Sequence, residues 1–140
     1  MKQKINTLEI KTKGQGLYEF TSNILKYLNE EKIKNGLLTI YVKHTSCSLL
    51  IQENADSDVK KDLLNFFSKI VPENENYIHK SEGLDDMPAH IKSSLTQTNL
   101  SIPIENFEIA LGTWQGVYLF EHRKSPHTRI IKMHLIGQNG

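Results

Sequence analysis

Apolar and polar residues change their spacing several times along the chain, and each change marks a predicted element. Positions 4–12 alternate loosely, which is typical of a half-buried strand. From Phe20 onward the apolar residues fall at helical spacing as far as the Asn-Gly pair at 35–36, which is a typical helix end. Positions 36–43 then return to a two-residue repeat, and a short strand-like run follows at 48–52.

The rest of the chain predicts a long helix, a shorter helix and then several strands. The long helix begins at Asp56, carries one apolar face and ends before Pro72. The segment 73–87 is polar and without period, and it leads, with Asp86 as N-cap, into a short helix at 89–98. Four strands are expected last, at 100–104, 107–111, 113–123 and 128–136. Strands grouped in runs favour an α+β fold of mostly antiparallel strands, with two main helices and one short helix.

Composition and charge indicate an ordinary globular protein with a single domain spanning 1–140. A content of 38% hydrophobic and 24% charged residues excludes a disordered tail and a disulfide-rich toxin. Seventeen basic against sixteen acidic residues leave a net charge of +1, so we expect no nucleic-acid partner. No segment is apolar over the roughly 20 residues that cross a bilayer, and no export signal is seen. We therefore expect a cytoplasmic protein without membrane contact.

The first chemical signal is the number of histidines, six in all, two of which bracket the polar segment. His79 and His90 enclose Glu82, Asp85 and Asp86, and imidazoles with carboxylates are the usual ligands of zinc and other borderline divalent ions. The spacing matches no general metal motif. The alternative is that the acidic residues are solvated and that Asp86 only caps the helix that follows.

A second group of candidates lies at the end of the strand at 36–43. His44 continues its apolar face, and Thr45 and Ser46 carry hydroxyls that can donate to an anion. The alternative is a histidine that only makes a structural hydrogen bond. Cys47 is out of phase with His44 on a regular strand, which argues against a cysteine-histidine nucleophile pair.

The strand at 113–123 places Glu121 and Trp114 on opposite faces. Glu121 shares its face with Val117 and Leu119, so burial should raise its pKa unless a metal or another cation stabilises the anion. A buried ion pair with Arg123 is the competing account. Trp114 could stack on a heteroaromatic ring, or it could belong to the core or to a subunit interface.

Basic residues flank the predicted turn near Pro126. Arg123, Lys124 and Arg129 are close enough in sequence to meet one phosphate or carboxylate, and an ordinary charged hairpin is the alternative. The phosphate-binding loop, the dinucleotide-binding glycine pattern and the zincin motif are all missing from the sequence. ATP, dinucleotide and zincin chemistry therefore have no motif to support them.

Several longer strings resemble the YjbQ family over essentially the full chain. They are HTSCSL at 44–49, ENAD at 53–56, Tyr77 with His79, GLDDMPAHIKSS at 83–94, LGTWQG at 111–116 and EHR at 121–123. The resemblance implies a β-sandwich-like α+β fold, a homotrimer and a divalent metal near the histidines. It also implies a weak thiamine-phosphate-synthase activity, in which a pyrimidine pyrophosphate joins a thiazole phosphate and pyrophosphate leaves. Cys47 stands where many members of that family carry alanine, which weakens a catalytic role for it.

The combined hypothesis is a small metal-assisted enzyme for a phosphorylated metabolite. His79, His90 and His44 would bind zinc or magnesium, and Asp85 or Glu121 would add a ligand or transfer a proton. The substrate contacts would come from Thr45, Ser46, Trp114, Arg123 and Arg129. The alternatives are a metal-dependent hydrolase of a phosphorylated or acylated metabolite and a non-catalytic module that binds a small anion.

Overall fold

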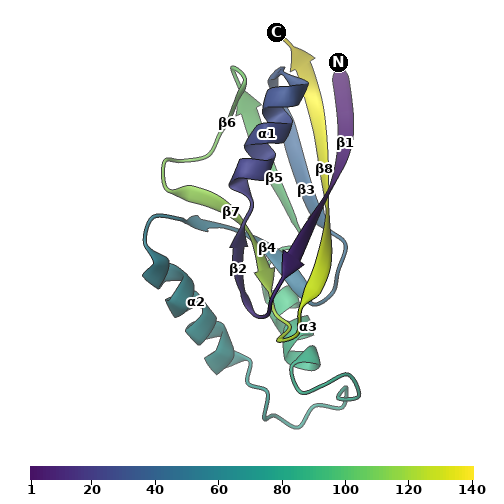
Figure 1. Cartoon of the computed structure of the whole chain (residues 1–140), viewed down its shortest axis with the longest axis vertical. Coiled ribbons are helices and arrows are strands. Elements are labelled where there is room, and N and C mark those ends of the chain that lie inside the picture. The colour runs from purple at the N-terminus through teal and green to yellow at the C-terminus, as the bar shows by residue number, and fades with distance from the viewer.

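Two antiparallel sheets and three helices form the molecule, which a computed structural model describes over residues 1–140 (Figure 1). The five-stranded sheet has the order β1-β8-β3-β5-β6 and the three-stranded sheet the order β2-β7-β4. The strands are β1 (Lys2–Thr12), β2 (Gly16–Glu19), β3 (Ile33–Val42), β4 (Cys47–Glu53), β5 (Asn99–Glu105), β6 (Glu108–Ile109), β7 (Gln115–Glu121) and β8 (His127–Asn139). The helices are α1 (Thr21–Glu31), α2 (Ser57–Ile70) and α3 (Asp86–Leu95).

The hydrophobic core lies between the two sheets, and α1 extends it along the five-stranded sheet (Figure 1). The alternation of side chains along β3 turns one face of the strand toward the core. Leu38, Ile40 and Val42 are buried on that face, whereas Leu37 and Tyr41 are exposed on the other. In β7 both faces are buried: Val117 and Leu119 belong to the core cluster, whereas Phe120 on the other face packs against Phe67 of α2. The predicted division of this strand into two faces is confirmed.

The helices α2 and α3 lie at the other end of the molecule from the chain termini (Figure 1). Asp56 caps α2 by accepting a hydrogen bond from the backbone N–H of Asp58 at 2.9 Å. The apolar face of α2 is only half covered: the ring of Phe67 packs edge-on against Phe120, with 5.3 Å between the ring centroids. The helix α3 is tied to the start of β4, because Ser93 Oγ donates to the carbonyl oxygen of Cys47.

The predicted α+β class with antiparallel sheets and three helices is confirmed, but some boundaries are wrong. The first helix ends at Glu31, well before the Asn-Gly pair. Lys32 adopts a left-handed conformation, and its backbone N–H donates to the carbonyl oxygen of Leu28 and closes the last turn. Ile33 then begins β3 and is buried in the core. Strand β2 has only four residues and gave no alternation long enough to recognise. No helix in the structure has the length and apolar character needed to cross a membrane.

Candidate metal centre

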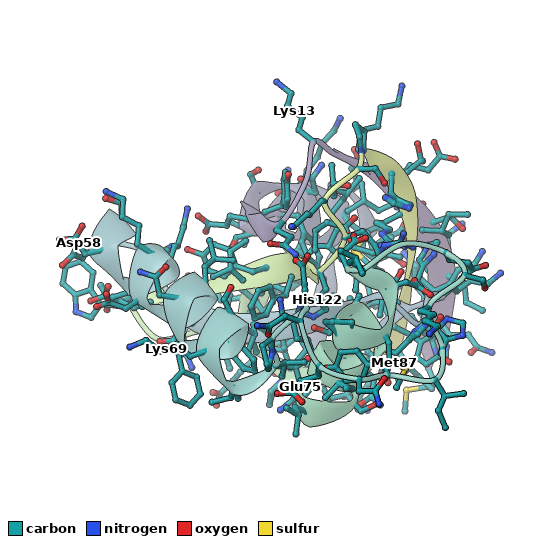
Figure 2. All side chains as sticks on the ribbon, turned by 90° about the horizontal axis from the view of Figure 1, so that it is seen from below. Lys13, Asp58, Lys69, Glu75, Met87 and His122 are labelled. Atoms are coloured by element: carbon teal, nitrogen blue, oxygen red, sulfur yellow. The ribbon has the colours of Figure 1, made fainter.

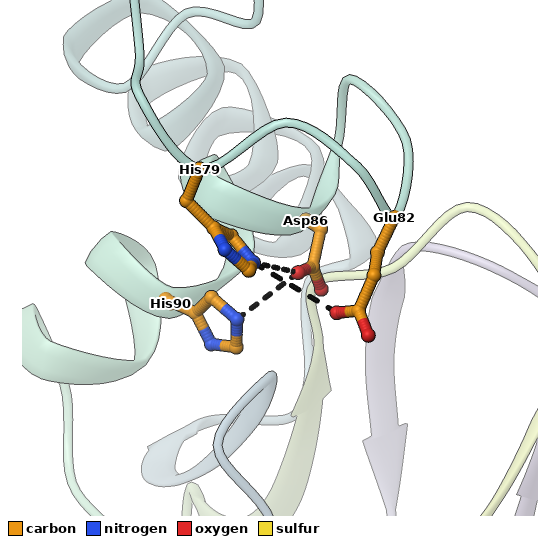
Figure 3. Close-up of side chains that lie close together, drawn as sticks. All are labelled: His79, Glu82, Asp86 and His90. Carbon is orange, nitrogen blue, oxygen red and sulfur yellow. Dashed lines mark hydrogen bonds and ion pairs between the residues drawn. The ribbon is translucent and has the colours of Figure 1, made fainter.

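Four side chains converge beside the first turn of α3 and form the one group that could hold a metal ion. The imidazoles of His79 and His90 and the carboxylates of Glu82 and Asp86 each offer a ligand atom, and these atoms all lie within 4.8 Å of one another (Figure 3). We call these four residues the His–carboxylate cluster. Two nitrogen and two oxygen donors are a set that zinc and similar borderline ions accept.

Helical spacing and a short loop bring the donors together. Asp86 and His90 are four positions apart on α3, so their side chains lie on one face, one above the other. His79 and Glu82 are three positions apart in the loop that precedes the helix. His90 Nδ1 lies 2.9 Å from the carbonyl oxygen of Thr45, and since a carbonyl only accepts, this nitrogen carries the proton. In the neutral ring the lone pair of His90 Nε2 therefore faces Asp86 Oδ2, at 3.1 Å.

Asp86 is the buried centre of the cluster. Its Oδ2 lies 2.6 Å from His79 Nε2, and its Oδ1 accepts from Arg123 Nη1 at 2.7 Å. Burial by itself would raise the pKa of Asp86, but the hydrogen bond with His79 and the charges of His90 and Arg123 hold that pKa below its ordinary value. The carboxylate is therefore ionised at neutral pH. The alternative reading of Asp86 as a mere N-cap is wrong, because Asp85 occupies the N-cap position.

Arg123 holds the loop in place and does not offer a free cation to a ligand. Its Nε donates to Asp85 Oδ2 at 3.0 Å and its Nη2 to the carbonyl oxygen of Glu82 at 2.9 Å. Asp85 also accepts from the backbone N–H of Lys124 at 2.8 Å, and these donors outweigh burial and lower its pKa. Asp85 and Arg123 therefore form an ion pair that fixes the loop and the Asp86 carboxylate in position.

Glu121 and Arg129 form a separate, fully buried ion pair. Arg129 Nε donates to Glu121 Oε1 at 2.7 Å, the Thr12 hydroxyl donates to the same oxygen at 2.7 Å, and Arg129 Nη2 donates to Ser46. Burial would raise the pKa of Glu121, but the hydrogen bonds from Arg129 and Thr12 lower it below its ordinary value. Of the two accounts of Glu121, the ion pair is the correct one, although its partner is Arg129 and not the side chain of Arg123.

His44 is not brought to the His–carboxylate cluster. Its Nε2 accepts the backbone N–H of Ile130 at 2.8 Å, and its Nδ1 faces the guanidinium of Arg129. Burial, followed by the charge of Arg129, lowers the pKa of His44. Because Nε2 already accepts from Ile130 and His44 is not part of the His–carboxylate cluster, the expectation that His44 is a third imidazole ligand is corrected to a structural hydrogen bond. Cys47 is likewise buried, and burial raises the pKa of its thiol to about 12.

The other predicted substrate contacts do not gather at one point. Trp114 is 63% exposed and precedes β7, whose seven residues put it roughly 20 Å from Glu121 at the opposite end of the strand. Lys124 pairs with Glu73, while Arg123 and Arg129 are engaged in two different ion pairs. The three basic residues near the predicted turn therefore do not meet one phosphate within this chain, because each one already has a carboxylate partner.

The contacts of Thr45, Ser46 and Glu82 differ from those that the sequence predicts. The carbonyl oxygen of Thr45 accepts from His90, and the Ser46 hydroxyl accepts from Arg129, whereas the sequence predicts hydroxyls that donate to an anion. Glu82 belongs to the cluster, although the predicted metal ligands are His79, His90 and His44. The four-residue spacing of Asp86 and His90 on a helix was the available signal for the cluster.

Taken together, the two-sheet α+β sandwich and the His–carboxylate cluster define the class: a small α+β protein with a candidate metal centre at one end of its sheets. A family model described as UPF0047 protein YjbQ-like matches residues 6–138. The chain belongs to the YjbQ/UPF0047 family.

Relatives and solved structures agree with this assignment. The chain is 51% identical to a UPF0047 protein of Synechocystis sp. over 138 residues, covering 98% of this chain and 94% of that protein. It is 43% identical to the YjbQ protein of Escherichia coli O157:H7 over 133 residues, covering 94% and 96%. The crystal structure of a YjbQ/UPF0047 protein from Clostridium acetobutylicum superimposes with a TM-score of 0.87 at 33% identity, covering 94% of this chain and 99% of that one.

Proposed function

We propose that this protein is a metal-assisted enzyme that acts on a small phosphorylated metabolite. The observation that carries the proposal is the convergence of His79, Glu82, Asp86 and His90, whose ligand atoms lie within 4.8 Å of one another. The reaction to test first is the one that the family resemblance implied, the joining of a pyrimidine pyrophosphate to a thiazole phosphate.

The donor set favours zinc over magnesium as the bound ion. Magnesium prefers an octahedral shell of oxygens, whereas two imidazoles with carboxylates suit zinc and other borderline ions. The surroundings fit as well, since the Thr45 carbonyl fixes the tautomer of His90 and Arg123 orients the carboxylate of Asp86. Such outer contacts are typical of metal ligands and keep them in one orientation.

A cavity of about 750 Å³ opens directly beside the cluster and is large enough for a small metabolite. His79 lines it together with Tyr77, Lys80 and Met87. A bound divalent ion would neutralise charge on a phosphate or pyrophosphate leaving group. Lys80 offers a cation on the same wall, and the ring of Tyr77 offers an apolar surface for the organic part of the substrate.

Metal binding is tested by titrating chelator-treated protein with zinc in a calorimeter and by elemental analysis. We expect one zinc per chain in the natural protein, and affinity at least about tenfold weaker in Asp86→Asn and His90→Ala. The matched control is His134→Ala, because His134 lies on the outer face of β8, where its Nε2 bonds Gln3. Equal zinc binding in all four proteins, or none in the natural protein, would refute the metal centre.

Activity is tested by following pyrophosphate release from the pyrimidine pyrophosphate, with and without the thiazole phosphate. Release that needs both the acceptor and zinc supports the synthase reaction. Release without the acceptor indicates a hydrolase instead. Zinc binding with no turnover of either kind would refute the enzyme and leave a module that binds a small anion.

A further inference from the structure

Arg129 has one guanidinium nitrogen that its ion pair with Glu121 does not use. Its Nε and Nη2 donate to the Glu121 carboxylate, and Nη2 also donates to Ser46. Glu121 ends β7 and precedes His122, which lies near the middle of the molecule when it is seen from below (Figure 2). The third nitrogen, Nη1, has a single polar neighbour, His44 Nδ1, at 3.5 Å. Whether Nη1 has an acceptor therefore depends on which nitrogen of His44 carries the proton.

The backbone fixes the tautomer of His44. The N–H of Ile130 donates to His44 Nε2 at 2.8 Å, so Nε2 presents a lone pair and carries no proton. The ring is then neutral, and its one proton is on Nδ1. An arginine nitrogen also only donates, so two donors face each other where Nδ1 meets Arg129 Nη1. Neither group accepts from the other, and both N–H groups are left without an acceptor.

Ser46 adds a third donor at the same guanidinium. Its hydroxyl oxygen accepts from Arg129 Nη2 at 3.0 Å, and its own O–H has no acceptor in the structure. Arg129 is 3% exposed and Ser46 is 8% exposed, so bulk water is largely excluded from both. Buried donors are paired in the great majority of cases, so three unpaired donors at one guanidinium need an explanation.

A ligand that only accepts hydrogen bonds fits this set of donors. The nearby oxygens of Glu121 are already occupied, because they accept from Arg129, from the Thr12 hydroxyl and from the backbone N–H of Arg123. A water molecule would accept from the free donors, but it would also bring two protons that need acceptors of their own. A carboxylate accepts through two oxygens and brings no proton.

The local charge favours an anion with a single negative charge. The charges that act on His44 are those of Arg129, Glu121, Lys43 and, when it is protonated, His127. Arg129 and Glu121 cancel each other, and the exposed Lys43 adds one positive charge. His44 itself is half-buried and the next residue, Thr45, is exposed, so a small ligand can approach from solvent.

We propose that this point is a binding site for the carboxylate group of a small organic acid, held by Arg129 Nη1, His44 Nδ1–H and the Ser46 hydroxyl. Hydrogen bonds between a guanidinium and a carboxylate are charge-assisted and stronger than neutral ones. The site differs in chemistry from the His–carboxylate cluster, because the imidazole offers a proton here and not a lone pair for a metal ion.

The first test is an NMR titration of metal-free natural protein with sodium acetate at constant ionic strength. Before acetate is added, the ring-nitrogen resonances should show the His44 proton on Nδ1. Acetate should shift these resonances and leave those of His134, whose Nε2 bonds Gln3 on the outer face of β8. Inorganic phosphate, titrated in parallel, should bind more weakly than acetate. Metal-free protein keeps the result separate from success or failure of the metal centre.

The second test uses His44→Gln, with the amide resonance of Ile130 as the reporter of binding. The glutamine oxygen can replace Nε2 as the acceptor for Ile130, while the donor at Nδ1 is lost. Loss of one donor to a charged ligand should weaken acetate binding about tenfold or more. Ser46→Ala should weaken it as well, although Arg129 Nη2 keeps the carbonyl oxygen of residue 46 as an acceptor. The matched control, His134→Gln, should bind acetate as the natural protein does.

The titration of the natural protein decides the matter even when a variant does not fold. A His44 proton on Nε2, or His44 resonances that acetate leaves unmoved, would overturn the proposal. Equal acetate binding by His44→Gln and the natural protein would overturn it too. Tighter binding of phosphate than of acetate would overturn the assignment of the ligand as a carboxylate.

Discussion

The carboxylate of Asp86 links the loop before α3 to the residues just after β7. It is held by His79 from the loop and by Arg123 from just beyond β7, while His90 approaches from the next helical turn. Removing either neighbouring donor would leave a buried charge with fewer partners, which is costly in a protein interior. At the scale of the residue, this density of contacts is what makes Asp86 a positioned ligand and not a solvated acid.

The buried imidazole of His122 predicts a pH-dependent stability. Because its pKa falls from 6.5 to about 3 on folding, the unfolded chain binds a proton below pH 6.5 that the folded chain does not. The contribution of the neutral His122 ring to the free energy of unfolding is fully present above pH 6.5 and decreases as the pH falls toward 3. Between pH 6.5 and pH 5 the free energy of unfolding should drop by about 2 kcal/mol from this group.

Urea unfolding at intervals between pH 7.5 and pH 5 measures this effect above the range where the carboxylates titrate. The variant His122→Gln should show a flatter dependence, while His134→Gln should keep that of the natural protein. His44 also has a lowered pKa and adds to the slope in the same direction, so some dependence remains in His122→Gln. An unchanged slope in His122→Gln would contradict the prediction.

Among the elements, β3 and β8 are brought unusually close where Gly36 faces Gly137. A Cβ atom added at Gly137 would overlap the carbonyl oxygen of Asn35 and lie 2.6 Å from Ile33 Cγ2. The register of β3 also shifts at this point, between Ile33 and Asn35. Gly36 and Gly137 thus allow β3 and β8 to approach closely near the start of β3, which follows α1 in the chain.

Gly137→Ala should therefore destabilise the protein by about 1–3 kcal/mol, the usual cost of overpacking. The matched control is Gly16→Ala in β2, where the nearest atom to an added Cβ is a ring carbon of Tyr18 at an ordinary 3.6 Å. Thermal and urea unfolding of the two variants measure the difference. Equal stability of both variants would show that β3 and β8 can separate at no cost.

At the scale of the whole molecule, the segment between α2 and α3 is held by contacts of the cluster, of Arg123 and of Lys124. His79 and Glu82 belong to this segment, whereas Asp86 and His90 belong to α3, so a shared ion would join the two. A ligand that binds only the folded state stabilises it according to its concentration relative to the dissociation constant.

Zinc at about 100 times its dissociation constant should therefore raise the free energy of unfolding by about 2.7 kcal/mol. Urea unfolding with and without zinc measures the gain, and limited proteolysis shows whether cleavage within 73–85 slows. Asp86→Asn should lose both effects, and His134→Ala should retain them. The same zinc effect in Asp86→Asn would contradict a cluster that joins the segment to α3.

The sequence by itself determined the local features of this protein. Periodicity identified the α+β class and the two faces of β7, because these depend on residues a few positions apart. The candidate ligands His79 and His90 were recognisable for the same reason. All of them, with Asp86 between, lie within twelve residues, so one loop and one helical turn suffice to bring them together.

Only the tertiary structure decided which distant groups meet. Alternation showed that Glu121 faces inward, but nothing in the sequence indicated that Arg129 would be its partner, that His44 would accept from Ile130, or that Arg123 would turn to Asp86. Such pairings depend on which strand lies beside which, and strand order is fixed by packing of the whole core. The contact between His122 and Ser48 has the same origin, since these residues lie 74 positions apart and only folding brings them together.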